Sequence, residues 1–100
     1  MQCIYNQRDV FDWDPSNPRK IRAHRVKTAE VEQALSHEPV LIYEQTVDGE
    51  ARYAYYGETE RGRLLAIVLT ERDDRIRVIT AYDLDAGQKH DYLERRAQGE

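Results

Sequence analysis

The sequence predicts one α+β domain spanning residues 1–100, in which helices flank a mainly antiparallel sheet. Two observations favour this class. Four consecutive segments between residues 40 and 82 have the composition of strands and are separated by turn-forming pairs. Segments with helical spacing of apolar residues come before and after these strands. The expected order of elements is therefore β-α-α-β-β-β-β-α.

The first third of the chain predicts one strand and two helices. Val10-Phe11-Asp12-Trp13 has strand character, with Phe11 and Trp13 on one face. Asp14-Pro15 is typical of a helix start, and Pro18 fits only a first turn, so a regular helix is expected from about Pro18 to His24. Thr28 is the next expected N-cap, and the helix that follows it carries an apolar stripe made of Val31, Ala34 and Leu35.

The sheet itself is expected from four strands, at Val40–Gln45, Ala51–Glu58, Arg63–Glu71 and Arg75–Tyr82. Asp48-Gly49 is a strong hairpin signal between the first two. The third strand is apolar on both faces, which places it centrally. In the second strand Tyr53 and Tyr55 share one face, with Ala54 and Tyr56 on the other. A last helix is expected over Asp85–Ala97, with helical spacing of Ala86, Leu93 and Ala97.

Composition excludes several classes of protein. Hydrophobic residues make up 40% of the chain and charged residues 34%, which indicates a globular domain with a charged surface. The longest apolar run, residues 64–69, is far too short to span a bilayer, and the first residues resemble no signal peptide. Cys3 is the single cysteine, so we expect no internal disulfide and a cytoplasmic location. The histidines lack metal-ligand spacing, so no metal site or cofactor is expected.

Charge is distributed unevenly along the chain. The net charge of −4 argues weakly against nucleic acid as a partner. Residues 15–27 nevertheless contain five basic side chains and no acid, whereas residues 28–60 contain eight acids and one base. The pattern suits an RNA-facing patch beside a surface for a basic partner, and ordinary scatter in a small domain explains it equally well.

Two arginines in the fourth strand are the clearest candidates for chemistry. Arg75 and Arg77 point to one side of the strand because side chains alternate, while Ile76 and Val78 point to the other. Two guanidinium groups on one face form an anion-binding surface suited to phosphate. The alternative is a solvated face on which both arginines pair with nearby carboxylates.

Several blocks of sequence, in order and spacing, resemble the BrnT family of toxins from type II toxin–antitoxin systems. The blocks are Phe11-Asp12-Trp13-Asp14-Pro15, Lys20-Ile21-Arg22-Ala23-His24-Arg25-Val26, Glu38-Pro39, Arg61-Gly62-Arg63-Leu64-Leu65, Asp74-Arg75-Ile76-Arg77-Val78-Ile79-Thr80-Ala81 and Ala81-Tyr82-Asp83-Leu84 with Lys89 and Tyr92. The resemblance covers residues 10–95. It implies a RelE-like fold, metal-independent endoribonuclease activity of the mRNA interferase type, and translation as the process suppressed. It also implies a cognate BrnA-like antitoxin that blocks the toxin, and contact with promoter DNA only through the toxin–antitoxin complex.

Metal-free RNA cleavage needs a proton acceptor, cations on the phosphate and a proton donor. Arg77 and then Arg75 are the expected phosphate-stabilising residues, and His24 is the acid–base candidate because histidine titrates near neutrality. His24 could equally cap the end of the first helix. We expect the RNA to contact Arg61, Arg63, Tyr82 and Lys89, although both turn arginines could be generic surface charges.

Tyrosines and two departures from the family pattern leave alternatives open. Tyr53, Tyr55 and Tyr56 could stack on bases, or could simply pack within the sheet. Tyr82 stands where the family usually has arginine, and Arg25 where glycine commonly follows the histidine. The alternative function is therefore a catalytically weak toxin homologue that binds its antitoxin and contributes to repression. A third possibility is a small scaffold unrelated to toxins.

Overall fold

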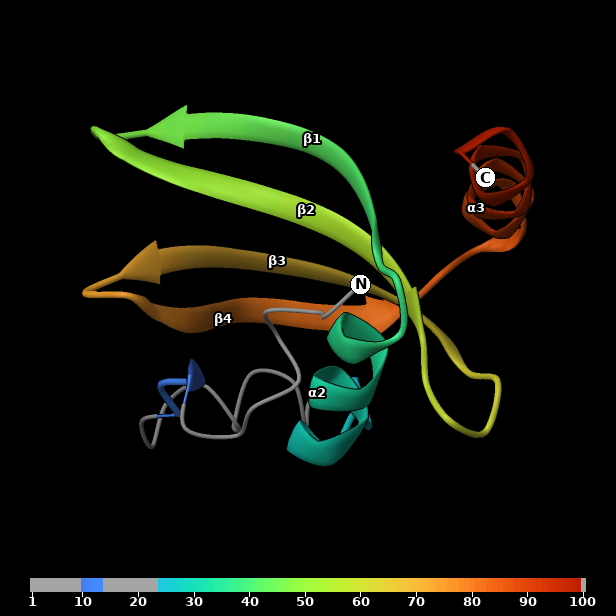
Figure 1. Ribbon diagram of the computed structural model, residues 1–100, viewed down its shortest axis with the longest axis horizontal. Helices are drawn as coiled ribbons and strands as arrows, with labels where there is room; N and C mark the ends of the chain where they lie inside the picture. Colours follow the sequence, from blue (N-terminus) through green and yellow to red (C-terminus); the bar gives the residue numbers. More distant parts are fainter. Residues whose placement is uncertain (1–9, 14–23, 100) are drawn as a thin grey trace.

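The computed structural model describes residues 10–13 and 24–99 (Figure 1). In chain order the elements are α2 (Thr28–Ser36), β1 (Val40–Val47), β2 (Glu50–Glu58), β3 (Leu64–Arg72), β4 (Arg75–Asp83) and α3 (Ala86–Gly99). The four strands form one antiparallel sheet in the order β1-β2-β3-β4. The α+β class, the four strands, the helix directly before them and the helix after them are confirmed. Among the described residues, no helix is long and apolar enough to cross a membrane.

The hairpin turns lie at the predicted pairs. Asp48, Asp73 and Asp74 have φ values of 51°, 55° and 63°, and Gly49 has 81°. Such left-handed conformations are tolerated best by glycine, asparagine and aspartate, and they match the twist of the strands that they join. Short local signals therefore fix how the four strands follow one another.

One face of the sheet packs on α2. The predicted stripe of Val31, Ala34 and Leu35 is fully buried. It packs with Leu65, Ile67, Leu69, Ile76, Val78 and Ala81 of the sheet and with Phe11 and Val26. Tyr53 and Tyr55 border the same core, as the predicted alternation in β2 requires. Burial of this stripe against strands β2 and β3 is what holds α2 on the sheet.

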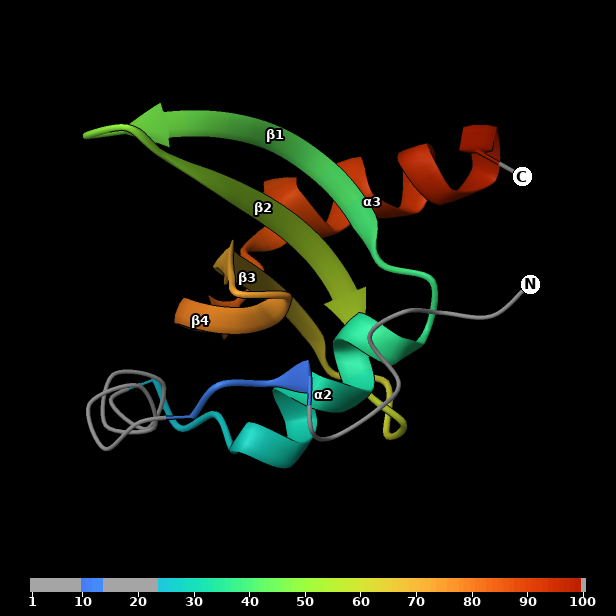
Figure 2. The same ribbon diagram turned by 60° about the vertical axis from the view of Figure 1, so that its left-hand side comes forward.

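The opposite face of the sheet packs on α3 at one end only (Figures 1 and 2). Tyr92 is fully buried with Tyr56, Ala66 and Leu84. The helical spacing of Ala86, Leu93 and Ala97 does not mark the face that packs on the sheet. All three residues are exposed, and 60% of Leu93 is accessible to solvent. A single large aromatic residue, Tyr92, supplies the contact instead.

A β-bulge interrupts β4 in its middle. Val78 is opposite Leu69 and Thr80 is opposite Val68, so Ile79 has no partner in β3. An extra residue on one strand reverses the alternation beyond it. Val78 and Ala81 consequently share the α2 core although they are three residues apart. Arg77 and Tyr82, five residues apart, likewise share the opposite face, since their partners Thr70 and Ala66 are four residues apart.

The N-terminal part of the predicted order needs correction. The strand expected at Val10–Trp13 is reduced to one parallel bridge between Phe11 and Ile76, with a hydrogen bond of 2.7 Å from the amide of Asp12 to the carbonyl of Ile76. Trp13 contacts α2 instead of continuing a strand, because its indole N–H donates to Glu32 at 2.8 Å. Phe11 and Trp13 do stack, with centroids 6.0 Å apart.

Two further expectations concern helix starts. The helix predicted over Pro18–His24 and its Asp14-Pro15 start lie outside the described residues, apart from His24, which is in a turn. Lys27 rather than Thr28 is the N-cap of α2. The Glu30 carboxylate accepts a hydrogen bond of 2.9 Å from the backbone amide of Lys27. A glutamate in the first helical turn can replace a capping side chain in this way because it satisfies a free amide.

Candidate functional site

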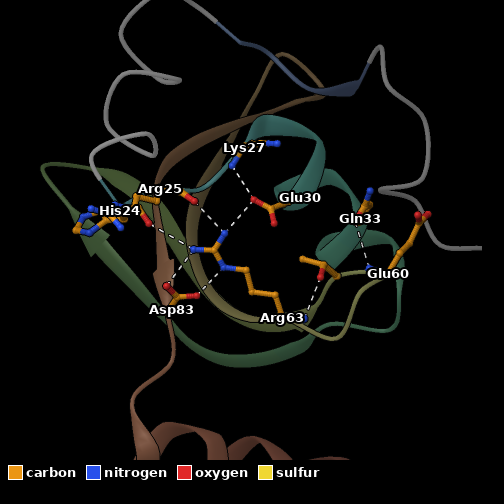
Figure 3. A network of polar contacts seen from close by, with 9 residues as sticks. His24, Arg25, Lys27, Glu30, Gln33, Glu60, Arg63 and Asp83 are labelled. Carbon is orange, nitrogen blue, oxygen red and sulfur yellow. Dashed lines mark hydrogen bonds and ion pairs between the residues drawn. The ribbon is translucent and has the colours of Figure 1, made fainter.

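A half-exposed network of hydrogen bonds and ion pairs, centred on Arg63, lies at one end of the sheet (Figure 3). Arg63 lies just before β3, on the α2 side. Its Nε and Nη2 donate to both carboxylate oxygens of Asp83 at 2.6 and 3.0 Å. Its Nη1 donates to Glu30 at 3.0 Å and to the carbonyl of Arg25 at 2.9 Å, and Nη2 donates to the carbonyl of His24 at 3.4 Å. These five bonds engage all five N–H groups that a guanidinium offers.

The network also determines the charge states of its members. The hydrogen bond from Arg63 lowers the pKa of Asp83, and the nearby charges of Lys89 and His24 lower it further. The hydrogen bonds to Asp83 and Glu30 raise the pKa of Arg63 above its already high value. Asp83 is therefore an anion and Arg63 a cation throughout the neutral range.

His24 and Tyr82 meet beside this network. Their ring centroids are 6.0 Å apart and the rings are tilted by 55°. His24 is exposed and Tyr82 is half-buried at the edge of the α3 contact. Lys89, near the start of α3, is close enough to influence Asp83. The end of β4 thus combines an imidazole, a phenol and a cation at the surface.

Arg75 and Arg77 lie at the other end of β4. Arg75 donates to the carbonyl of Phe11 at 2.9 Å, and an Arg77 nitrogen lies 3.9 Å from a carboxylate oxygen of Asp12. Arg77 pairs with Thr70 of β3, and Tyr82 pairs with Ala66, four positions away on the same strand. At about 3.3 Å per residue, Arg77 and Tyr82 are separated by roughly 13 Å along the sheet. The two arginines and the His24–Tyr82 pair thus occupy two separate parts of the molecule, with Arg77 and Tyr82 on one face.

The predicted site residues therefore divide into groups. His24 and Tyr82 come together, and Lys89 lies near the adjacent Asp83. Arg75 and Arg77 form a second group, and Arg61 is exposed in the β2–β3 loop. Arg63, expected to contact RNA, is half-exposed and uses its N–H groups in hydrogen bonds within the protein. Arg25, which stands where the family commonly has glycine, has a φ of 59°, a left-handed conformation that glycine adopts most readily.

Sequence reasoning missed three acidic members of these groups. Glu30 and Asp83 hold Arg63, and Asp12 lies beside Arg77. The predicted extent of the fourth strand puts Asp83 directly after its end, which could have suggested a part for Asp83 at this edge of the sheet. No local pattern in the sequence indicates that Arg63 contacts Glu30. Among the described residues, no group of three or more histidine, cysteine or acidic side chains could hold a metal ion.

Fold and site together define a small α+β protein with a polar surface site at the end of a four-stranded antiparallel sheet. Residues 13–87 match the family model of the ribonuclease toxin BrnT of type II toxin–antitoxin systems. The chain belongs to this family of toxins. Membership implies an RNA substrate and a cognate antitoxin as partner. A search of curated proteins finds no significant match.

Proposed function

We propose that this protein is a metal-independent endoribonuclease of the mRNA interferase type, with a RelE-like fold, that suppresses translation in the cytoplasm. Its family supports ribonuclease activity in general. The observation that carries the finer proposal is the contact between the rings of His24 and Tyr82, next to Asp83, whose carboxylate is influenced by the charge of Lys89. Groups able to move protons and a group able to bind phosphate meet there at the surface.

Each residue then has a distinct task in cleavage. His24 accepts the proton of the attacking 2′-hydroxyl or returns one to the leaving oxygen, because imidazole exchanges protons near neutral pH. Tyr82 orients the imidazole or stacks on a base, and Lys89 contacts the reacting phosphate. Arg77 and Arg75 bind phosphates further along the RNA, on the face that Arg77 shares with Tyr82, and Arg61 holds a flanking phosphate.

The proposed partner is a BrnA-like antitoxin, and the complex of the two proteins contacts promoter DNA to repress it. The acidic segment, residues 28–60, is the proposed contact surface for a basic antitoxin segment. It forms α2, β1 and β2, and Glu44 and Asp48 are exposed on β1 and the turn after it. Complementary charge favours the encounter of two such surfaces.

Inducible expression in a bacterial host tests the proposal, with growth and RNA integrity followed together. Wild type should arrest growth and degrade RNA, and His24→Gln and Arg77→Ala should relieve both effects. The matched control is Arg95→Ala, because Arg95 pairs with Asp91 on exposed α3, away from the site. Arrest by all four proteins would refute the assigned roles of His24 and Arg77.

Normal growth at equal soluble expression would instead favour the catalytically weak toxin homologue. The observation behind this alternative is Tyr82, which is half-buried against α3 where the family usually has arginine. A phenol donates a hydrogen bond but cannot supply a permanent positive charge. The variant Tyr82→Arg would then be expected to gain RNA cleavage while antitoxin binding stays unchanged.

A further inference from the structure

Arg63 connects the sheet to a turn far away in sequence. Two of its hydrogen bonds go to consecutive main-chain carbonyls, those of His24 and Arg25, which lie 39 and 38 residues earlier. Ion pairing with carboxylates alone would explain the other three bonds but not these two. The contacts with the carbonyls indicate that Arg63 holds the backbone of the turn itself.

The turn needs such an external constraint. Arg25 has a φ of 59°, a left-handed conformation that costs a non-glycine residue about 1–2 kcal/mol. His24 and Arg25 are both exposed, so burial fixes the chain only from Val26 onward. A turn that is strained and exposed keeps one conformation only if other groups over-determine it.

The guanidinium is itself held in a fixed plane. Asp83 accepts two parallel hydrogen bonds from Nε and Nη2, which is the bidentate geometry that only arginine forms with a carboxylate. Oxygen Oε1 of Glu30 accepts both from Arg63, at 3.0 Å, and from the amide of Lys27, at 2.9 Å. The segment from His24 to Lys27 is therefore fixed at both ends by one network (Figure 3).

We propose that Arg63 is the positioning residue of the site: it fixes the turn at His24 and Arg25 and thereby sets the imidazole of His24 against Tyr82. Its part in cleavage rests on the proposed function, whereas its effect on the ring contact does not. Lysine at this position keeps the charge but cannot bind Asp83 in a bidentate manner and reach both carbonyls. Glu30 and Asp83 act through Arg63.

The test combines a structural readout with a kinetic one. In wild type, NMR should detect proximity of the His24 and Tyr82 ring protons as a nuclear Overhauser effect, with His24→Gln identifying the signal. Arg63→Lys should lose this effect and lower kcat about 100-fold with KM little changed, since misplacing a reacting group has effects of this order. Arg95→Lys, an exposed ion-pair arginine on α3, should change neither quantity.

Retention of the ring contact in folded Arg63→Lys would overturn the proposal, whatever its activity. Should Arg63→Lys fail to fold, Asp83→Asn answers the same question, because it leaves Arg63 in place without its bidentate partner and should weaken the same signal. Unchanged cleavage by His24→Gln would refute the catalytic part of His24 alone, while the NMR signal still decides the part of Arg63.

Discussion

Replacing Gly57 by alanine tests how closely strand β2 approaches helix α2. A Cβ atom at Gly57 would lie 2.6 Å from the carbonyl oxygen of Ala34, 3.0 Å from its carbonyl carbon and 3.1 Å from its Cβ. Ordinary contacts begin at 3.4 Å, so helix and strand must separate by roughly 0.8 Å at this point. The obstacle is helix backbone rather than the end of a flexible side chain, and it cannot rotate away.

The expected cost follows from that geometry. Inserting a methyl group into a packed interior typically destabilises a protein by about 1–3 kcal/mol. For a domain of this size each kcal/mol lowers the melting temperature by roughly 4–8 °C, so Gly57→Ala should melt roughly 4–24 °C below wild type. Thermal and urea unfolding followed by circular dichroism measure both quantities.

The matched control is the same substitution at Gly87, in the first turn of α3. A Cβ there would meet only the carboxylate of Asp85, at 3.6 Å. Alanine should stabilise this helix by about 0.5–1 kcal/mol, because it is a better helix former than glycine. The two substitutions should therefore change stability in opposite directions. A Gly57→Ala protein as stable as wild type would refute the close approach of β2 to α2.

Two further expectations concern the network around Arg63. Arg25→Gly should raise the free energy of unfolding by about 1 kcal/mol in urea titrations, because glycine adopts the left-handed φ of 59° without strain, and a loss of stability would contradict that reasoning. The second expectation concerns pH. Arg63 lowers the pKa of Asp83 in the folded state, so this stabilisation is complete above the ordinary aspartate pKa of 3.8 and is lost as pH falls through the lower folded value. The stability advantage of wild type over Asp83→Asn should thus be constant near neutral pH and shrink in acid, and an advantage that grows in acid would exclude the ion pair as its source.

Local patterns in the sequence were sufficient for much of the fold. Alternation correctly separated Arg75 and Arg77 from Ile76 and Val78, of which the last two are buried. The turn pairs at 48–49 and 73–74 fixed the hairpins, because few residues other than aspartate and glycine tolerate positive φ. These features depend on each residue and its near neighbours, which a single sequence contains.

Features that depend on distant partners could not be predicted in this way. The bulge at Ile79 is defined by its pairing with β3, and nothing in Val78-Ile79-Thr80 marks it. Plain alternation along β4 would place Arg77 and Tyr82, five residues apart, on opposite faces of the sheet. The bulge reverses the alternation and brings both residues to one face. The hydrogen bonds of Arg63 join residues that are 20 to 39 positions apart in the sequence. Which side of α3 faces the sheet, that of Tyr92 rather than Leu93, depends on the direction of the helix relative to the sheet.

Cleavage of a synthetic single-stranded RNA by the purified protein in the presence of a chelator tests the central claim most directly. Wild type should cleave without added metal and leave cyclic phosphate ends, since the 2′-hydroxyl is the proposed nucleophile, and His24→Gln should be at least about 100-fold slower. Cleavage that stops in chelator, or that proceeds equally fast in His24→Gln, would contradict a metal-independent site built on the His24–Tyr82 pair.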